Sequence, residues 1–224
     1  MSNYIIGSGV KVEIGLTEGA SKIIGAISLA NPGLVSAVAH GLSFGSVGYF
    51  DNVIGMDQID GQAAKVTDAG SPSADNFALE DINTTNFAPF ISGIFVPVTA
   101  FSTLAQSTDV DLGGGAAKTA DTTTLIDTRE KQVSILNAFE TVTISLLSLK
   151  DDNQAMAKIR AVARVLGFLV FRMTYPPSSG QTIGAQRLFR GQPSLPGEKT
   201  SKAAVGTGQL SVTIQGQVCY LRGA

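Results

Sequence analysis

Apolar and polar residues alternate along two segments of the chain, close to residues 141–146 and 209–220. A period of two places successive side chains on opposite faces of an extended strand. The apolar faces consist of Val142, Ile144 and Leu146 in the first segment, and of Leu210, Val212, Ile214, Gly216, Val218 and Tyr220 in the second. The opposite faces are polar but uncharged: Thr141, Thr143 and Ser145, then Gln209, Ser211, Thr213 and Gln215. Such a face is typical of a contact between subunits or of the wall of an aqueous pore. A threonine-rich solvent face is the alternative.

Between these two segments the apolar spacing changes to three and four residues, which predicts one helix over about 151–166. Asp151, Asp152 and Asn153 supply an N-cap and an acidic first turn. Gly167 is expected to take the left-handed conformation that ends the helix. The apolar stripe consists of Ala155, Met156, Ile159, Val162, Ala163 and Leu166. We expect this stripe to cover one face of a sheet and to leave the polar strand face open.

The rest of the chain has the pattern of a mainly β protein. The run 168–171 is apolar on both faces, as in a central strand. A strand near Val10–Leu16 is expected to have a solvent face formed by Lys11 and Glu13. Pro97 has no N–H, so Phe95–Phe101 should be an edge strand, or the proline nitrogen should face no partner. Gly216 is expected to mark a bulge or a close approach of the helix.

Residues 102–132 are small and polar, and they include the run Gly113, Gly114 and Gly115. Such a segment buries too little apolar surface to offset its ordering entropy. We therefore expect a long loop that is either mobile or ordered by another subunit, with a plain surface loop as the alternative.

Composition narrows the classes of function. Charged residues make up only 15% of the chain, and 16 Lys and Arg against 18 Asp and Glu form no basic run. That balance argues against tight binding of a nucleic-acid backbone, and sparse charge suits a surface covered by partner subunits. The amino terminus lacks the basic and apolar regions of a secretory signal, and no apolar run approaches a bilayer span of ~18–20 residues. We expect a soluble protein made in the cytoplasm.

Candidate catalytic groups are few. His40 lies in a turn, and together with the single Cys219 it is too little for a metal site. Asp109 and Asp111 fall in the predicted loop, while the Asp151 and Asp152 pair is explained by helix capping. The triple glycine is not followed by Lys-Ser or Lys-Thr, so it is not a phosphate-binding loop. The sequence predicts no enzyme, cofactor or metal.

The order of segments resembles the tail tube proteins of long-tailed bacteriophages. The segments that carry the resemblance are Gly7–Glu13, Phe95–Phe101, Asp127–Glu130, Asp151–Asp152 with Leu169–Arg172, Gly191–Glu198 and Gly206–Gly216. Residues 30–61, from Ala30-Asn31-Pro32-Gly33 to Asp60-Gly61, are similar to the small β module named for ubiquitin-activating enzymes. The resemblance implies a β-sandwich or barrel-like core over 1–25 and 94–224, one flanking helix, and an inserted small β module over 26–93.

The resemblance also implies a function. Tail tube proteins form stacked hexameric rings, and strands of six subunits line a lumen through which double-stranded DNA passes without specific binding. The uncharged strand faces are then expected at the lumen or between subunits. Residues expected to contact the next ring are Asp109, Asp111, Gly113, Gly114, Gly115, Lys118 and Asp121. The implied partners are further copies of the chain and other tail proteins (tape measure, tail terminator, baseplate or tip), in the virion tail and without a membrane. The alternatives are a monomeric adhesion or carbohydrate-binding protein and a ring subunit of a bacterial contractile or secretion tube.

Overall fold

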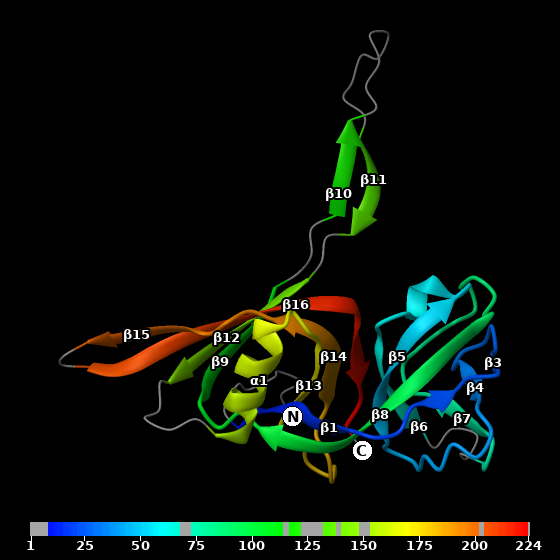
Figure 1. Cartoon of the computed structure of the whole chain (residues 1–224), viewed down its shortest axis with the longest axis horizontal. Helices are drawn as coiled ribbons and strands as arrows, with labels where there is room; N and C mark the ends of the chain where they lie inside the picture. Colours follow the sequence, from blue (N-terminus) through cyan, green and yellow to red (C-terminus); the bar gives the residue numbers. More distant parts are fainter. Residues whose placement is uncertain are drawn as a thin grey trace.

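The computed structural model describes residues 9–67, 73–113, 117–121, 132–137, 140–147, 153–201 and 204–223. Within them the chain is mainly β with one α-helix, which confirms the predicted fold class (Figure 1). What we call the helix half contains β1 (Lys11–Glu18), β9 (Ser107–Leu112), β12 (Thr141–Leu147), α1 (Gln154–Arg164), β13 (Leu169–Thr174), β14 (Gln186–Pro193), β15 (Gly197–Ser201) and β16 (Ala204–Leu221). The small-strand half contains β2 (Lys22–Ile23), β3 (Ala26–Ile27), β4 (Leu34–Ser36), β5 (Val47–Ile54), the short helix η1 (Asp57–Ile59), β6 (Ala63–Thr67) and β7 (Asn76–Leu79).

One curled antiparallel sheet runs through both halves. Its strand order is β3-β4-β7-β6-β5-β8-β1-β13-β14-β16-β12-β9, with β2 and β15 paired at the sides. Strand β8 (Ser92–Thr103) joins the halves because it pairs with β5 on one side and with β1 on the other. Strands β10 (Ala117–Asp121) and β11 (Gln132–Asn137) form a separate two-stranded sheet that stands away from the rest in Figure 1. The predicted domain limits at 26 and 93 stay a prediction.

Two hydrophobic cores lie on opposite faces of the central strands. One core packs α1 against β1, β12, β13 and β16, and the other fills the small-strand half. Leu169 and Phe171 of β13 belong to the first core, while Val170 between them belongs to the second. The central strand predicted from the run 168–171 is therefore confirmed, and its alternating side chains hold the two cores together.

The helix has a predicted N-cap residue, Asn153, but it begins at Gln154 without the predicted acidic first turn, and it ends differently. The Asn153 side chain accepts a hydrogen bond from the Met156 N–H at 2.9 Å, which caps the first turn; Asp151 and Asp152 lie outside the described residues. The left-handed residue is Leu166, with φ 54°, and not Gly167. Gly167, the residue after Leu166, donates its N–H to the Val162 carbonyl at 3.0 Å. This hydrogen bond closes the last turn of the helix.

The long loop predicted over 102–132 is wrong for most of its described residues. Strand β8 continues to Thr103, β9 pairs with β12, and β10 pairs with β11. The local sequence favours neither helix nor strand here. Strands β12 and β11 nevertheless supply backbone hydrogen-bond partners, and a polar residue can form these backbone bonds as well as an apolar one. Gly114 and Gly115 lie outside the described residues.

Pro97 lies inside β8 between β5 and β1, so the edge-strand alternative is wrong. Its carbonyl oxygen accepts the Gly19 N–H at 2.7 Å. Because the nitrogen and carbonyl of one strand residue face the same side, the proline nitrogen faces the break between β1 and β2. The missing N–H is thus tolerated within a paired strand.

Of the solvent face predicted for the first strand, Lys11 is exposed, but Glu13 is buried at 6% exposure, so the prediction is wrong for Glu13. Its carboxylate contacts the Lys11 Nζ at 2.6 Å and an Arg172 guanidinium nitrogen at 2.8 Å. The Arg172 guanidinium also lies 4.0 Å from the Phe101 ring centroid. Burial raises the pKa of Glu13, but the hydrogen bonds and charges of Lys11 and Arg172 outweigh it and hold the pKa below its ordinary value of 4.5.

A bulge interrupts the last strand at Gly216, where φ is 77°. Leu188 pairs with Cys219 while Arg190 pairs with Gln215, so β16 carries extra residues at this point. The close approach is made by Gln62 and not by the helix. Leu188 and Arg190 lie on one side of β14, so Cys219 stays on the same side of the sheet as Gln215. There Cys219 and Leu221 are buried by the core of the small-strand half, whereas Tyr220, which was predicted on the apolar face, is 53% exposed.

Candidate functional site

The two uncharged polar strand faces predicted from the sequence form one continuous surface. Strands β12 and β16 are neighbours, and directly opposite residues share a face of the sheet. The opposite pairs are Thr141 with Thr213, Thr143 with Ser211, and Ser145 with Gln209. Thr141, Gln209 and Thr213 are exposed, and the other three are half-buried. We call this surface, with its extensions on the two flanking strands, the polar face.

Strand β9 extends the polar face on one side. Asp111 lies opposite Thr143, and Asp109 lies opposite Ser145, and both carboxylates are exposed. These two residues were predicted in a loop that contacts the next ring, but they belong to the same rows as the threonines. Gly113 follows directly and donates its N–H to the Thr141 carbonyl at 3.1 Å. Lys118 and Asp121, from the same predicted set, lie in β10, apart from this sheet.

Strand β14 extends the polar face on the other side with two residues that the sequence analysis missed. Gln192 lies opposite Thr213, and Arg190 lies opposite Gln215. The alternation at 190 and 192 was the available signal, but the following Pro-Ser-Leu-Pro run favoured a turn at this point. Gln215 differs from the other predicted residues because its amide oxygen accepts from Arg190 at 2.9 Å and its side chain lies against Gly61.

The reverse side of these strands explains why the polar face is open. Val142, Ile144 and Leu146 of β12 are buried with Leu210, Val212 and Ile214 of β16. The same core contains Ala155, Met156 and Ile159 of the helix. Helix α1 therefore covers one side of the sheet, as predicted, and a sheet covered on one side exposes alternate residues on the other.

Arg190, the cation at the margin of the polar face, is held by several groups. Its guanidinium lies 4.1 Å from the Tyr49 ring centroid and 4.9 Å from that of Phe168, with Asp51 at 3.9 Å. Tyr49 in turn donates its hydroxyl to Glu18 at 3.0 Å, and burial together with the Glu18 charge raises the pKa of Tyr49 to about 12. With this arginine engaged and two carboxylates on β9, the polar face is neutral to mildly acidic.

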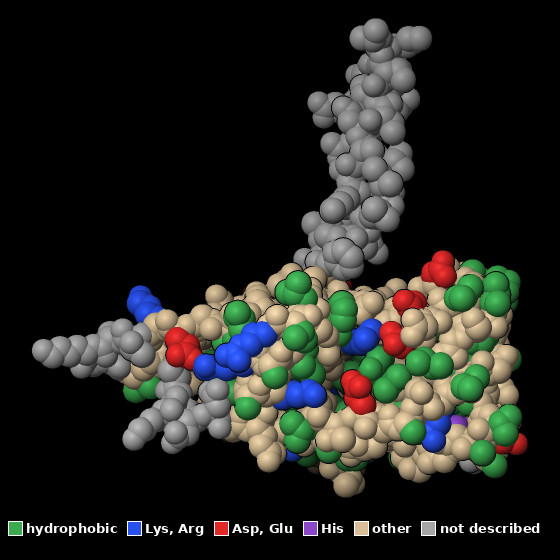
Figure 2. Space-filling view, in the orientation of Figure 1, with side chains coloured by type: hydrophobic (Ala, Val, Ile, Leu, Met, Phe, Trp, Pro, Cys, Tyr) green, Lys and Arg blue, Asp and Glu red, His purple; other side chains and the backbone are tan. Residues whose placement is uncertain are grey.

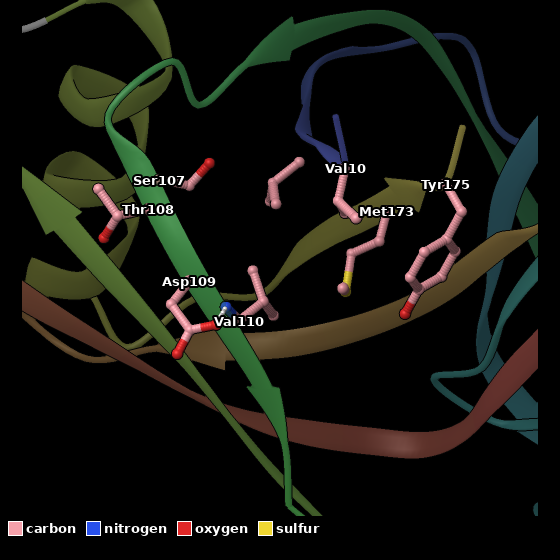
Figure 3. Close-up of a pocket in the computed structure, with 8 residues that line it drawn as sticks. Val10, Ser107, Thr108, Asp109, Val110, Met173 and Tyr175 are labelled. Atoms are coloured by element: carbon pink, nitrogen blue, oxygen red, sulfur yellow. Dashed lines mark hydrogen bonds between the residues drawn. The ribbon is translucent and has the colours of Figure 1, made fainter. Parts of the chain in front are cut away.

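A cavity of about 230 Å³ adjoins the polar face at β9. Figure 3 shows Val10, Val110, Met173 and Tyr175 around it, with Asp109 at its rim. Strand β9 ends the strand order, and its Val110 N–H is taken by the Asp109 side chain at 3.0 Å. The lining offers one carboxylate among aliphatic and hydroxyl groups, so it has no acid–base or nucleophile pair.

The two remaining residues with reactive side chains, His40 and Cys219, are both buried. His40 is 1% exposed, packs edge-on against Phe77 and accepts the Leu42 N–H at Nδ1. Burial raises the pKa of the Cys219 thiol to about 12, so the reactive thiolate is suppressed. The described part of the chain contains no group of three or more His, Cys, Asp or Glu side chains that could hold a metal ion. None of its helices is long and apolar enough to cross a bilayer.

The family model described as "Phage tail tube protein, TTP" matches residues 55–221, which include β12, α1, β14 and β16. The chain belongs to this family. It is therefore a structural component of a phage tail tube, and the polar face lies within the span that the family model covers. No curated protein matches the chain.

Proposed function

We propose that this tail tube subunit assembles into stacked, hexameric rings and that its polar face lines the lumen through which double-stranded DNA leaves the phage. The observation that supports this most is the register of β12 with β16, which puts the paired threonine, serine and glutamine residues of both strands (Thr141 with Thr213, Thr143 with Ser211, Ser145 with Gln209) on the side away from α1. Strand β9 ends the strand order of the described residues, so its outer side suits continuation of the sheet into a neighbouring subunit, although the Asp109 side chain takes the Val110 N–H.

Charge favours the lumen over a contact between subunits for this face. Each Lys or Arg that neutralises a DNA phosphate adds affinity, so a basic wall would retain the DNA. Hydroxyl and amide groups carry no charge that would neutralise a phosphate, and Asp109 and Asp111 beside them repel phosphates. The wall that results lets DNA pass without specific binding.

A lysine on the polar face tests this assignment. Thr143→Lys should leave tube assembly intact but lower infectivity at least tenfold, since the lumen then carries one added cation per subunit. The control is Ser179→Lys, which adds the same charge in an exposed turn outside the polar face. Tubes are counted and measured by negative-stain microscopy, and their ring number by cryo-electron microscopy. Failure of Thr143→Lys alone to assemble would instead place this face between subunits, and monomeric wild-type protein would contradict the function itself.

The β10–β11 ribbon is proposed as a contact to the next ring. A two-stranded ribbon is marginally stable by itself, so contact with another subunit would supply the missing support. Of the residues predicted for this contact, Lys118 and Asp121 lie in β10, and Asp109, Asp111 and Gly113 lead toward it from β9. Deletion of residues 117–137 should leave single rings that do not stack, which sedimentation velocity measures.

Residues 26–93 are proposed as an inserted small β module, and the protein as a non-enzymatic subunit made in the host cytoplasm. Its other proposed contacts are with tape measure, terminator and baseplate or tip proteins. The family match favours a tube subunit over a monomeric adhesion protein. Co-purification with a sheath protein would separate a contractile or secretion tube from a non-contractile tail.

A further inference from the structure

Charge is divided unevenly along the chain. Residues 26–93 contain seven Asp and Glu but only Lys65 as a cation, whereas the rest of the chain has 15 Lys and Arg against 11 Asp and Glu. Figure 2 shows the same division on one face of the molecule, with Lys and Arg over α1 and Asp and Glu mainly toward β5 and β8. The small-strand half is thus acidic, and the opposite half carries the compensating basic charge.

Exposed isoleucines lie within the acidic half. Ile54 at the end of β5 is 57% exposed, and Ile91 just before β8 is 70% exposed. The two are neighbours, because the Ile91 N–H donates to the Ile54 carbonyl at 2.9 Å. Asp57 is exposed three residues after Ile54, in η1. We call Ile54, Asp57 and Ile91 the acidic patch.

The end of α1 also exposes apolar side chains, but here the neighbouring charged residues are basic. Val165 is 76% exposed and Leu166 is 71% exposed, directly after the exposed Arg164. Lys158 lies two turns before Val165, on the same side of the helix. We call Lys158, Arg164, Val165 and Leu166 the basic patch.

The backbone at Leu166 adds an independent observation. Its φ of 54° is left-handed, a conformation in which a glycine avoids the steric penalty of a side chain. Leucine at this position accepts that penalty and also exposes a large apolar side chain to water. Neither effect stabilises the isolated subunit, so strain and exposure together point to a contact made outside it.

We propose that the basic patch of one copy docks on the acidic patch of a second copy. Two acidic patches, or two basic patches, repel each other, so each patch should meet the unlike patch of another copy and not its own counterpart. A contact between unlike surfaces of identical subunits produces rings or open stacks, which is the arrangement a tube requires. This inference rests on the proposed self-assembly and names the surfaces that perform it.

Leu166→Gly separates a docking role from a folding role. Glycine relieves the left-handed strain, so the melting temperature of the subunit should stay the same or rise. Loss of the apolar side chain should still reduce the assembled fraction at least tenfold in sedimentation velocity. Unchanged assembly of Leu166→Gly would overturn the proposal.

A charge exchange tests the pairing of the two patches. Arg164→Glu and Asp57→Arg should each reduce assembly, and the protein with both changes should assemble again because the charges are exchanged. Arg222→Glu is the control, since it reverses an exposed arginine outside both patches. Absence of rescue in the double variant would contradict the proposal.

Cross-linking between differently labelled copies gives a direct readout. A Val165→Cys subunit mixed with an Ile91→Cys subunit should form a disulfide-linked dimer on oxidation, while each variant alone should not. If the wild-type protein forms tubes but the mixed cysteine variants give no such cross-link, this contact is overturned and the proposed function stands. Wild-type protein that stays monomeric overturns both.

Discussion

The helix half and the small-strand half share one sheet but present opposite surfaces. In the helix half, α1 covers one side of β12 and β16 and leaves an uncharged polar face on the other. In the small-strand half, the surface is acidic and exposes single isoleucines such as Ile54 and Ile91. One continuous sheet can thus hold two cores and give each half of the subunit a different surface.

The two halves also differ in how their polar groups are satisfied. In the helix half, Glu13 is buried with Lys11 and Arg172, so charge is neutralised inside the fold. In the small-strand half, Lys65 is half-buried and pairs with Glu80 at 2.8 Å, but acidic groups such as Asp57 are exposed. Arg190 lies between the halves and contacts both, since it stacks on Tyr49 of β5 and bonds Gln215 of β16. Changes at these residues should separate the contributions of the two halves.

The largest effect is expected from Ile159→Asp, with Met156→Asp close to it. Ile159 is fully buried between α1 and the sheet, so an unpaired carboxylate there should cost about 5 kcal/mol and prevent folding. Circular dichroism and thermal unfolding measure the loss. Ala157→Asp adds the same charge at an exposed helix position and should cost about 0.5 kcal/mol. A normally folded Ile159→Asp monomer would show that this stripe is not core.

Glu13→Gln is expected to lower the free energy of unfolding by about 2–3 kcal/mol at pH 7, because Arg172 is left largely buried without its counter-charge. Denaturant unfolding measures the change. Lys11 is 53% exposed, so Lys11→Gln should cost no more than about 1 kcal/mol.

The effect of Glu13→Gln should also depend on pH. The folded pKa of Glu13 lies below 4.5, so the ion pair contributes in full above pH 4.5 and its contribution is lost as pH falls through the folded value. The difference between wild type and variant should therefore shrink in acid. A difference that is constant from pH 7 to pH 3 would contradict the role of the carboxylate.

Arg190→Lys should cost about 1–2 kcal/mol, because an ammonium group replaces neither the stacking on Tyr49 and Phe168 nor the planar hydrogen bond to Gln215. Hydrogen exchange should show faster opening of β5 and β14 together, since the side chain links them. If only one of the two strands exchanges faster, Arg190 does not couple the halves. Arg222→Lys serves as the exposed control.

The smallest effect is expected at Cys219, in the core of the small-strand half. Its thiol is 2% exposed and its pKa is raised to about 12. A maleimide should leave the native protein unlabelled at pH 8, and pH 9 should add almost nothing because the thiolate stays rare. Rapid labelling in native buffer would show that this half opens more readily than its packing indicates.

Much of the fold follows from the sequence because it depends on local period. The alternation at 141–146 and 209–215 predicted two strands with opposite faces, and the spacing at 155–163 predicted the helix; both are confirmed. The local pattern gave wrong predictions where a residue's structure depends on a distant strand that pairs with it. Polar residues 107–112 became a strand because β12 pairs with them. Glu13 became buried because Arg172 lies across from it on β13.

The residues that can form an uncharged polar face follow from the sequence, because the alternation of each strand depends only on that strand's own residues. Only the tertiary structure decided that the two faces adjoin, that Asp109 and Asp111 continue them, and that Gln215 is drawn away by Arg190. The physical reason is that register and strand order depend on hydrogen bonds between distant segments, which no local period encodes. The bulge at Gly216 shows the same limit, because the pairing of Cys219 with Leu188 and its burial in the core of the small-strand half depend on residues far away in the chain.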